Sequence, residues 1–133
     1  MESKFKHLEF IQGVINRVAH CSFLLKGWSV ILLSGLFALA AKDKNILFVY
    51  LAYLPVLTFW VLDGFYLYQE RLYRNLYNNV KDQQSDDIDF SMNTKEFIGI
   101  NKATWCESIF SKTMLLFHLP IFITVCIVII ICI

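Results

Sequence analysis

Three titratable side chains lie inside long apolar stretches of this sequence. Lys26 and Asp63 stand near the two ends of "FLLKGWSVILLSGLFALAAKDKNILFVYLAYLPVLTFWVLDGF", and His118 lies within "TMLLFHLPIFITVCIVIIICI". An isolated charge in hydrocarbon costs several kcal/mol, whereas a paired charge costs far less. The chemistry that these residue types offer is therefore mutual neutralisation, with histidine as the member that titrates near neutral pH.

Counting from the polar turn "KDKN" predicts that Lys26 and Asp63 lie at one depth. Lys26 stands 16 positions before the first residue of that turn, and Asp63 stands 18 positions after its last. Both therefore lie roughly 24–27 Å from the tip of a helical hairpin, and His118 falls in the same layer. We expect Lys26 and Asp63 to neutralise each other, within one chain or between neighbours. One alternative is that Lys26 snorkels to the headgroups, Asp63 caps or pairs locally and His118 bonds a carbonyl. The other is a polar layer that lines a water-filled path or senses protonation.

The elements that position these residues follow from composition. The 133-residue chain is 57% hydrophobic and 17% charged, with a mean hydropathy of +0.55, whereas about 45–50% apolar residues is usual for soluble domains. Because a helix needs roughly 20 apolar residues to cross about 30 Å of hydrocarbon, we expect spans at residues 22–41, 46–68 and 113–133. The predicted fold is an all-α integral membrane protein, with a hairpin of two transmembrane helices, a C-terminal transmembrane helix and amphipathic cytoplasmic helices.

The chain divides into four predicted segments. They are an N-terminal amphipathic cytoplasmic helix (1–21), the transmembrane hairpin (22–68), a cytoplasmic helical segment (69–112) and the C-terminal transmembrane helix (113–133). Apolar residues spaced by three and four predict helices in the first segment and at the start of the third. These amphipathic helices are expected either at the membrane interface or clear of it, packed on other copies of the chain. Pro55 and Pro120 predict kinks in the second and third spans.

The cytoplasmic segment carries three local signals. Glu70 and Arg74 are expected to form an i,i+4 ion pair on a helix that continues the second span without a break. Residues 81–93, "KDQQSDDIDFSMN", are predicted to form an acidic loop. Asn93 followed by Glu96 fits a capping box and predicts a further helix that leads into the last span.

Basic residues set the expected orientation, because cytoplasmic flanks carry an excess of Lys and Arg. Nine of the 12 basic residues lie in the N-terminal and middle segments, and two lie in the hairpin turn. This distribution predicts a cytoplasmic N-terminus and an outward-facing hairpin tip and C-terminus. No small-residue cleavage site follows the N-terminal residues, so we expect the first span to be retained.

The first span carries a seam of small residues, whereas the second span is bulky and aromatic. The seam consists of Gly27, Ser34, Ala38 and Ala41. Small residues let helix backbones approach closely in lipid. The seam is expected to face either the aromatic side chains of the second span or a neighbouring subunit. Three spans cannot enclose a sizeable cavity alone, which favours a homo-oligomer.

No pattern in the sequence indicates enzymatic chemistry. The three histidines have no metal-like spacing, no Gly-rich phosphate loop occurs, and the aspartates of residues 81–93 lack the Gly and Glu of a calcium loop. Cys21, Cys106, Cys126 and Cys132 have no paired spacing. A net charge of +1 without a basic patch gives no case for nucleic acid. We therefore expect no catalytic residue, cofactor or metal, and the expected partners are the lipid bilayer, other copies of the chain and an unidentified protein.

The stretches "HLEFIQGVINRVAHCSFLLKGWSV" and "LDGFYLYQERLYRNLY" resemble bacterial inner-membrane proteins of the RipA-like family. The resemblance covers roughly the first 80 residues, and in Francisella-type intracellular bacteria such a protein supports growth inside host cells. It implies a homo-oligomer, described for the family as an octamer, in the cytoplasmic membrane, with a link to stress or pH adaptation. The matching positions are Lys26, Gly27, Trp28, Asp63, Gly64, Glu70 and Arg71.

Together these features predict a non-enzymatic, homo-oligomeric protein of the bacterial inner membrane that acts as a scaffold or sensor in stress, pH or intracellular-growth adaptation. The alternative is a pore or channel, or a membrane-disrupting anti-phage effector. A channel needs a continuous polar path, and most of the third span, notably "VIIICI", is aliphatic.

Overall fold

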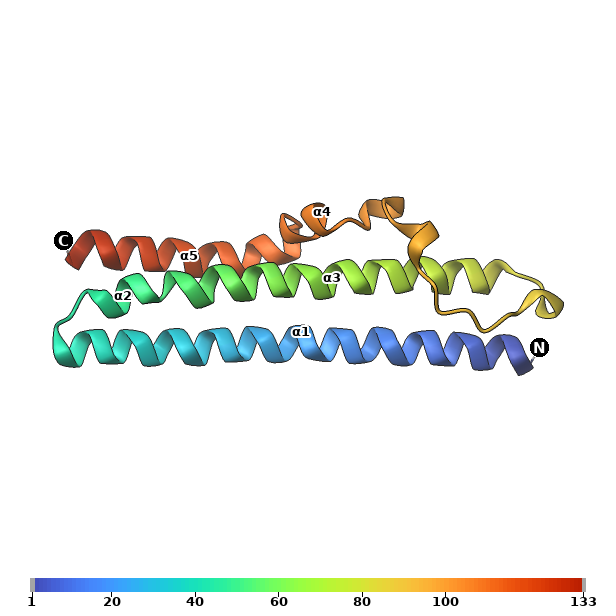
Figure 1. The fold of residues 1–133 in the computed structure, drawn as a ribbon, viewed down its shortest axis with the longest axis horizontal. Coiled ribbons are helices and arrows are strands. Elements are labelled where there is room, and N and C mark those ends of the chain that lie inside the picture. The colour runs from blue at the N-terminus through green and yellow to red at the C-terminus, as the bar shows by residue number, and fades with distance from the viewer. Residues whose placement is uncertain (1, 133) are drawn as a thin grey trace.

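The computed structural model describes residues 2–132, and in this part of the chain all regular structure is helical (Figure 1). The long helices are α1 (Glu2–Asp43), α3 (Tyr53–Asp82) and α5 (Lys112–Cys132), and the short ones are α2 (Leu47–Leu51) and α4 (Trp105–Ile109). Three 3-10 turns, η1 (Ser85–Asp87), η2 (Lys95–Phe97) and η3 (Ile100–Lys102), lie between α3 and α4. Three helical stretches, Glu2–Asp43, Leu47–Asp82 and Lys112–Cys132, are long and apolar enough to cross a membrane. Met1 and Ile133, which the predicted segments 1–21 and 113–133 include, lie outside the described residues.

Helix α1 is continuous over 42 residues and joins two segments that the sequence predicted as separate. No proline occurs in it, and its three glycines are widely spaced, so each costs only about 1 kcal/mol relative to alanine. The predicted boundary between residues 21 and 22 is therefore a change in the character of the helix surface, not a break in the helix.

The second apolar stretch is interrupted near its proline. Pro55 has no N–H to donate to the carbonyl of Leu51, and the chain passes through a turn at Ala52, between α2 and α3. From Tyr53 the helix runs 30 residues without a break, as predicted for the continuation of the second span. Helix α5 continues through Pro120, and Thr124 donates its hydroxyl to the Pro120 carbonyl at 2.8 Å.

Helix α3 lies between α1 and α5 in Figure 1, with α1 and α3 antiparallel along most of their length. Near the hairpin turn, Leu33, Val56 and Val125 belong to one buried apolar cluster. At the opposite end, Ile11 of α1 packs in a second cluster with Leu76 of α3. Ile11 and Ile15 of the predicted apolar stripe are thus covered by α3 of the same chain, whereas Phe5 of that stripe is 62% exposed. Packing of the exposed part on the membrane or on other copies stays a prediction.

The further helix predicted from Asn93 and Glu96 is wrong. The Asn93 side chain accepts the Lys95 amide at 3.0 Å, but the helical turn that follows, η2, has only 3 residues. Backbone φ angles of 86° at Gly99 and 52° at Asn101 are incompatible with a continuous right-handed helix. The capping-box pattern therefore yields an isolated turn.

The irregular segment lies along α3 and is fixed there by side chains. Arg71 donates to the carbonyl of Lys102 at 2.8 Å, and Asn75 donates to the carbonyl of Ile100 at 2.8 Å. The predicted acidic loop 81–93 also begins later than expected, because α3 extends to Asp82. Helix α4 starts at the following cap, where the Thr104 hydroxyl accepts the Glu107 amide at 3.3 Å.

Candidate functional site

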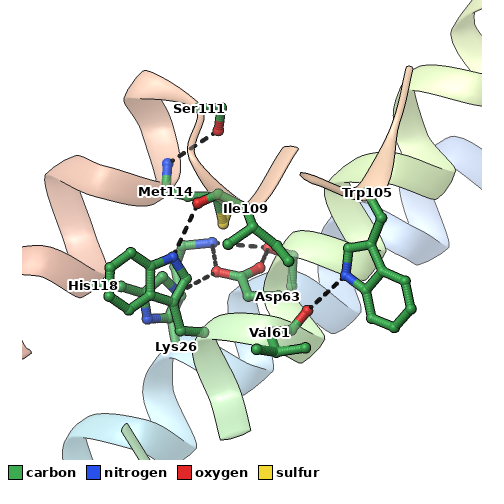
Figure 2. Close-up of polar contacts among 10 residues, drawn as sticks. Lys26, Val61, Asp63, Trp105, Ile109, Ser111, Met114 and His118 are labelled. Carbon is green, nitrogen blue, oxygen red and sulfur yellow. Dashed lines mark hydrogen bonds and ion pairs between the residues drawn. The ribbon is translucent and has the colours of Figure 1, made fainter. Parts of the chain in front are cut away.

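The three long helices meet at Asp63, whose side chain is fully buried (Figure 2). Lys26 of α1 places its ammonium 2.6 Å from Asp63 Oδ2, and His118 of α5 places Nε2 2.8 Å from the same oxygen. Ser22 of α1 donates its hydroxyl to the other carboxylate oxygen. We call these four residues the Asp63 node. The structure thus brings together the three residues predicted as an intramembrane polar layer, within one chain, and adds a serine.

Lys26 lies at the edge of the node. Its side chain is 23% exposed, and its ammonium also donates to Ser22 Oγ at 2.8 Å. Ser22 precedes Lys26 by one helical turn, so the two side chains share a face of α1. The ring centroid of Phe117 lies 5.8 Å from the ammonium, within the range of a cation–π contact. Lys26 is therefore neutralised by Asp63 while part of its stem remains at the surface.

His118 is held in a fixed orientation by aromatic neighbours. Its ring is 1% exposed and stacks on Trp60, with centroids 5.9 Å apart and an interplanar angle of 7°. The Phe117 ring meets it edge-on at 4.9 Å. The Trp60 indole N–H donates to the carbonyl of Ile109 at 3.0 Å, which fixes the stacking partner in turn. Because an ionised carboxylate only accepts hydrogen bonds, the Asp63 contact assigns the proton of neutral His118 to Nε2.

Helix α4 packs against α3 beside the node. A Cβ on Gly64 would lie 3.1 Å from the Cα of Ile109 and closer still to that residue's side chain. Only glycine lets the two backbones approach this closely. The Trp105 indole N–H donates to the carbonyl of Val61 at 3.2 Å and fixes the other end of the contact. Residues of α1, α4 and α5 therefore surround Asp63 of α3.

This arrangement supports ion pairing more than nucleophilic catalysis. The Ser22–Lys26 contact places a hydroxyl beside an amine, as a serine–lysine nucleophile pair would. An ammonium that is paired with Asp63 has no free electron pair to accept the serine proton, and Ser22 already donates that proton to Asp63. Within residues 2–132, no group of three or more His, Cys, Asp or Glu side chains could hold a metal ion.

The seam of small residues does not face the second span. Gly27, Ser34, Ala38 and Ala41 are all exposed, and a Cβ on Gly27 would meet nothing within 4 Å. The face of α1 that α2, α3 and α5 cover instead includes Ser29 and Leu33, which are buried. Pairing of the seam with the aromatic side chains of the hairpin is therefore wrong, and the seam lies on the outer surface of the chain.

The remaining predicted residues lie outside the node. Arg74 pairs with Glu70 at 2.8 Å on the surface, where the arginine is 62% exposed, so the pair contributes about 0.3–0.5 kcal/mol at most. Trp28 is exposed on α1. Sequence reasoning missed Ser22 and Trp105. The position of Ser22, four residues before Lys26, is a signal for the first, whereas nothing local marks the second.

No protein-family model, curated protein or solved structure matches this chain. The resemblance to the RipA-like family stays a prediction. The function is therefore argued from the geometry of the Asp63 node and of the helices that carry it.

Proposed function

We propose that the chain is a non-enzymatic, homo-oligomeric protein of the bacterial inner membrane, with its N-terminus in the cytoplasm, that acts as a scaffold or sensor. The observation that carries the proposal is the convergence of three candidate membrane spans on one buried carboxylate, Asp63. The link to stress, pH or intracellular growth comes from the family resemblance alone.

The connection between the node and the opposite end of the molecule supports a sensing role. Helices α1 and α3 pass through the node and continue without interruption to the apolar cluster around Ile11 and Leu76. His118 of α5 and Lys26 of α1 both contact the Asp63 carboxylate of α3, so a change at the node alters the relation of α5 to α1 and α3. Because continuous helices transmit displacement, such a change reaches the cytoplasmic pair of helices.

The surface of the chain favours a scaffold over a pore. Asp63 and His118 are sealed from solvent, so this polar layer provides no water-filled path within a single chain. A pore between subunits would have to be lined by exposed faces, and on α5 these are mainly aliphatic, apart from Lys112, Thr113 and Thr124. The most exposed large residues there are Leu116, Ile123, Ile127, Ile130 and Ile131.

The outward position of the seam supports self-association. Gly27, Ser34, Ala38 and Ala41 form an open strip along α1, and α3 packs on a different face. In lipid, small residues on an exposed helix face permit close contact with another helix. We infer that the seam is the contact between subunits.

Native mass spectrometry of the detergent-solubilised protein tests the assembly. The expected wild-type species is a homo-oligomer, with an octamer as the number implied by the family. Gly27→Leu is expected to shift it to monomer, because the added side chain blocks the seam. Gly35→Leu is the matched control, since a Cβ at either glycine meets nothing within 4 Å in the single chain. A monomeric wild type, or equal effects of the two variants, would contradict the proposal.

Planar bilayer recordings separate a scaffold from a channel. We expect no reproducible single-channel steps from the wild type or from Lys26→Ala. Steps that recur in wild-type protein and change in amplitude in the variant would show conduction past the node, and would overturn the scaffold.

A further inference from the structure

The hairpin turn and the last turn of α5 line a half-open cavity of about 390 Å³. Its lining is mainly apolar and comes from α1, α2 and α5, including Ala41, Val49 and Val128. Lys44 and Asn45 are the polar residues of the lining. The volume lies within the range of about 300–1,000 Å³ that is usual for ligand pockets.

The cavity lies at the level where a bilayer changes from acyl chains to headgroups. Helix α5 has 21 residues and is therefore roughly 32 Å long, close to the hydrocarbon thickness of about 30 Å. Cys132 in its last turn lines the cavity together with Lys44. This placement rests on the proposed membrane insertion, but on neither self-association nor sensing.

The turn supplies a cation without an internal partner. Lys42 and Lys44 flank Asp43, which leaves one net positive charge, and the ion pairs found within residues 2–132 involve none of the three. The turn itself is fixed, because the Asn45 side chain accepts the Leu47 amide at 3.0 Å. The backbone of a cationic turn is thus held beside an apolar cavity, and the exposed Lys44 side chain belongs to its lining.

We propose that this cavity binds an acyl chain of an anionic phospholipid whose phosphate lies against Lys44. The apolar lining fits the hydrocarbon, and the unpaired ammonium fits the charge of the headgroup. Because the cavity lies at the boundary between acyl chains and headgroups, a single phospholipid contacts both its apolar lining and Lys44. Anionic lipids gain about fivefold in affinity from one basic side chain at a membrane surface, so this site prefers them to zwitterionic lipids of the same chain length.

Lipid retained in native mass spectra tests the site, with protein extracted from nanodiscs of equal parts phosphatidylglycerol and phosphatidylcholine. The expected result is about fivefold more bound phosphatidylglycerol than phosphatidylcholine, and equal amounts for Lys44→Gln. Ala41→Leu fills the cavity and is expected to lose most of the bound lipid. Ala38→Leu is the matched control, because Ala38 belongs to the same exposed seam but does not line the cavity.

Equal retention of the two lipids by the wild type would overturn the proposal, as would equal lipid loss in the two leucine variants. Unfolding curves of Lys44→Gln and Ala41→Leu establish that a lost lipid reflects the site and not the fold. The same spectra report subunit number, so a monomer that still prefers phosphatidylglycerol would refute the assembly and support the lipid site.

Discussion

Removing either charge of the Lys26–Asp63 pair is expected to destabilise the protein, and the two removals are expected to differ in their free-energy cost. Breaking a buried ion pair by deleting one partner costs about 3–5 kcal/mol, because the other charge stays buried without compensation. In Asp63→Asn the uncompensated group is Lys26, which is 23% exposed and can extend toward the headgroups. The expected cost is about 3 kcal/mol, at the low end of this range.

In Lys26→Met the uncompensated group is the Asp63 carboxylate, which is fully buried and cannot reach solvent. It retains hydrogen bonds from Ser22 and His118 only. The expected cost is therefore about 4 kcal/mol or more. The double variant Lys26→Met/Asp63→Asn carries neither charge, and its amide oxygen still accepts from His118. We expect it to lose about 2 kcal/mol or less, which is far below the sum of the single variants.

Unfolding in mixed micelles with increasing sodium dodecyl sulfate, followed by circular dichroism, measures each free energy. A second cycle on Glu70 and Arg74, with Glu70→Gln and Arg74→Met, provides a control in the same molecule. That exposed pair is expected to show a coupling of about 0.3–0.5 kcal/mol. If the coupling of Lys26 with Asp63 were no larger than this, the node would not be a buried ion pair and the reasoning would fail.

Two further predictions concern packing. Gly64→Ala is expected to lower the free energy of unfolding by about 1–3 kcal/mol, because the new Cβ meets the backbone of α4. Gly13→Ala is the control. It has open space around it and is expected to be neutral or stabilising in the same micelle titration. Ile11→Ala is expected to cost about 2–5 kcal/mol by leaving a cavity in the cluster that Ile11 forms with Leu76. Faster amide exchange in the first half of α1 than near the hairpin turn would show where the loss occurs.

The layer of the node was predictable because depth in a helical hairpin follows from counting residues. A rise of about 1.5 Å per residue placed Lys26 and Asp63 level with each other, and the structure has them in contact. Counting gives height but not direction around the helix axis. For that reason counting did not indicate that the seam containing Gly27 points outward. Ser22 is signalled only by its position one helical turn before Lys26.

The segment between α3 and α5 was the least predictable part of the fold. A capping box at Asn93 signals a helix start, but it does not say how far the helix continues. Left-handed backbone at Gly99 and Asn101 ends any such helix, and hydrogen bonds from Arg71 and Asn75 fix the resulting turns. These bonds join residues 25 or more positions apart, so no local pattern reveals them.

The unbroken length of α1 carries a tilt at the Asp63 node to its N-terminal end, together with α3, on which it packs at Ile11. Glu2 stands 24 residues before Lys26, and this arm is roughly 36 Å long. Transmembrane helices change tilt when the bilayer thins or thickens. If the α1–α3 pair tilts at the node by about ten degrees, its far end moves by about 6 Å. A change in bilayer thickness that tilts the pair would therefore shift that end by more than the length of a side-chain contact.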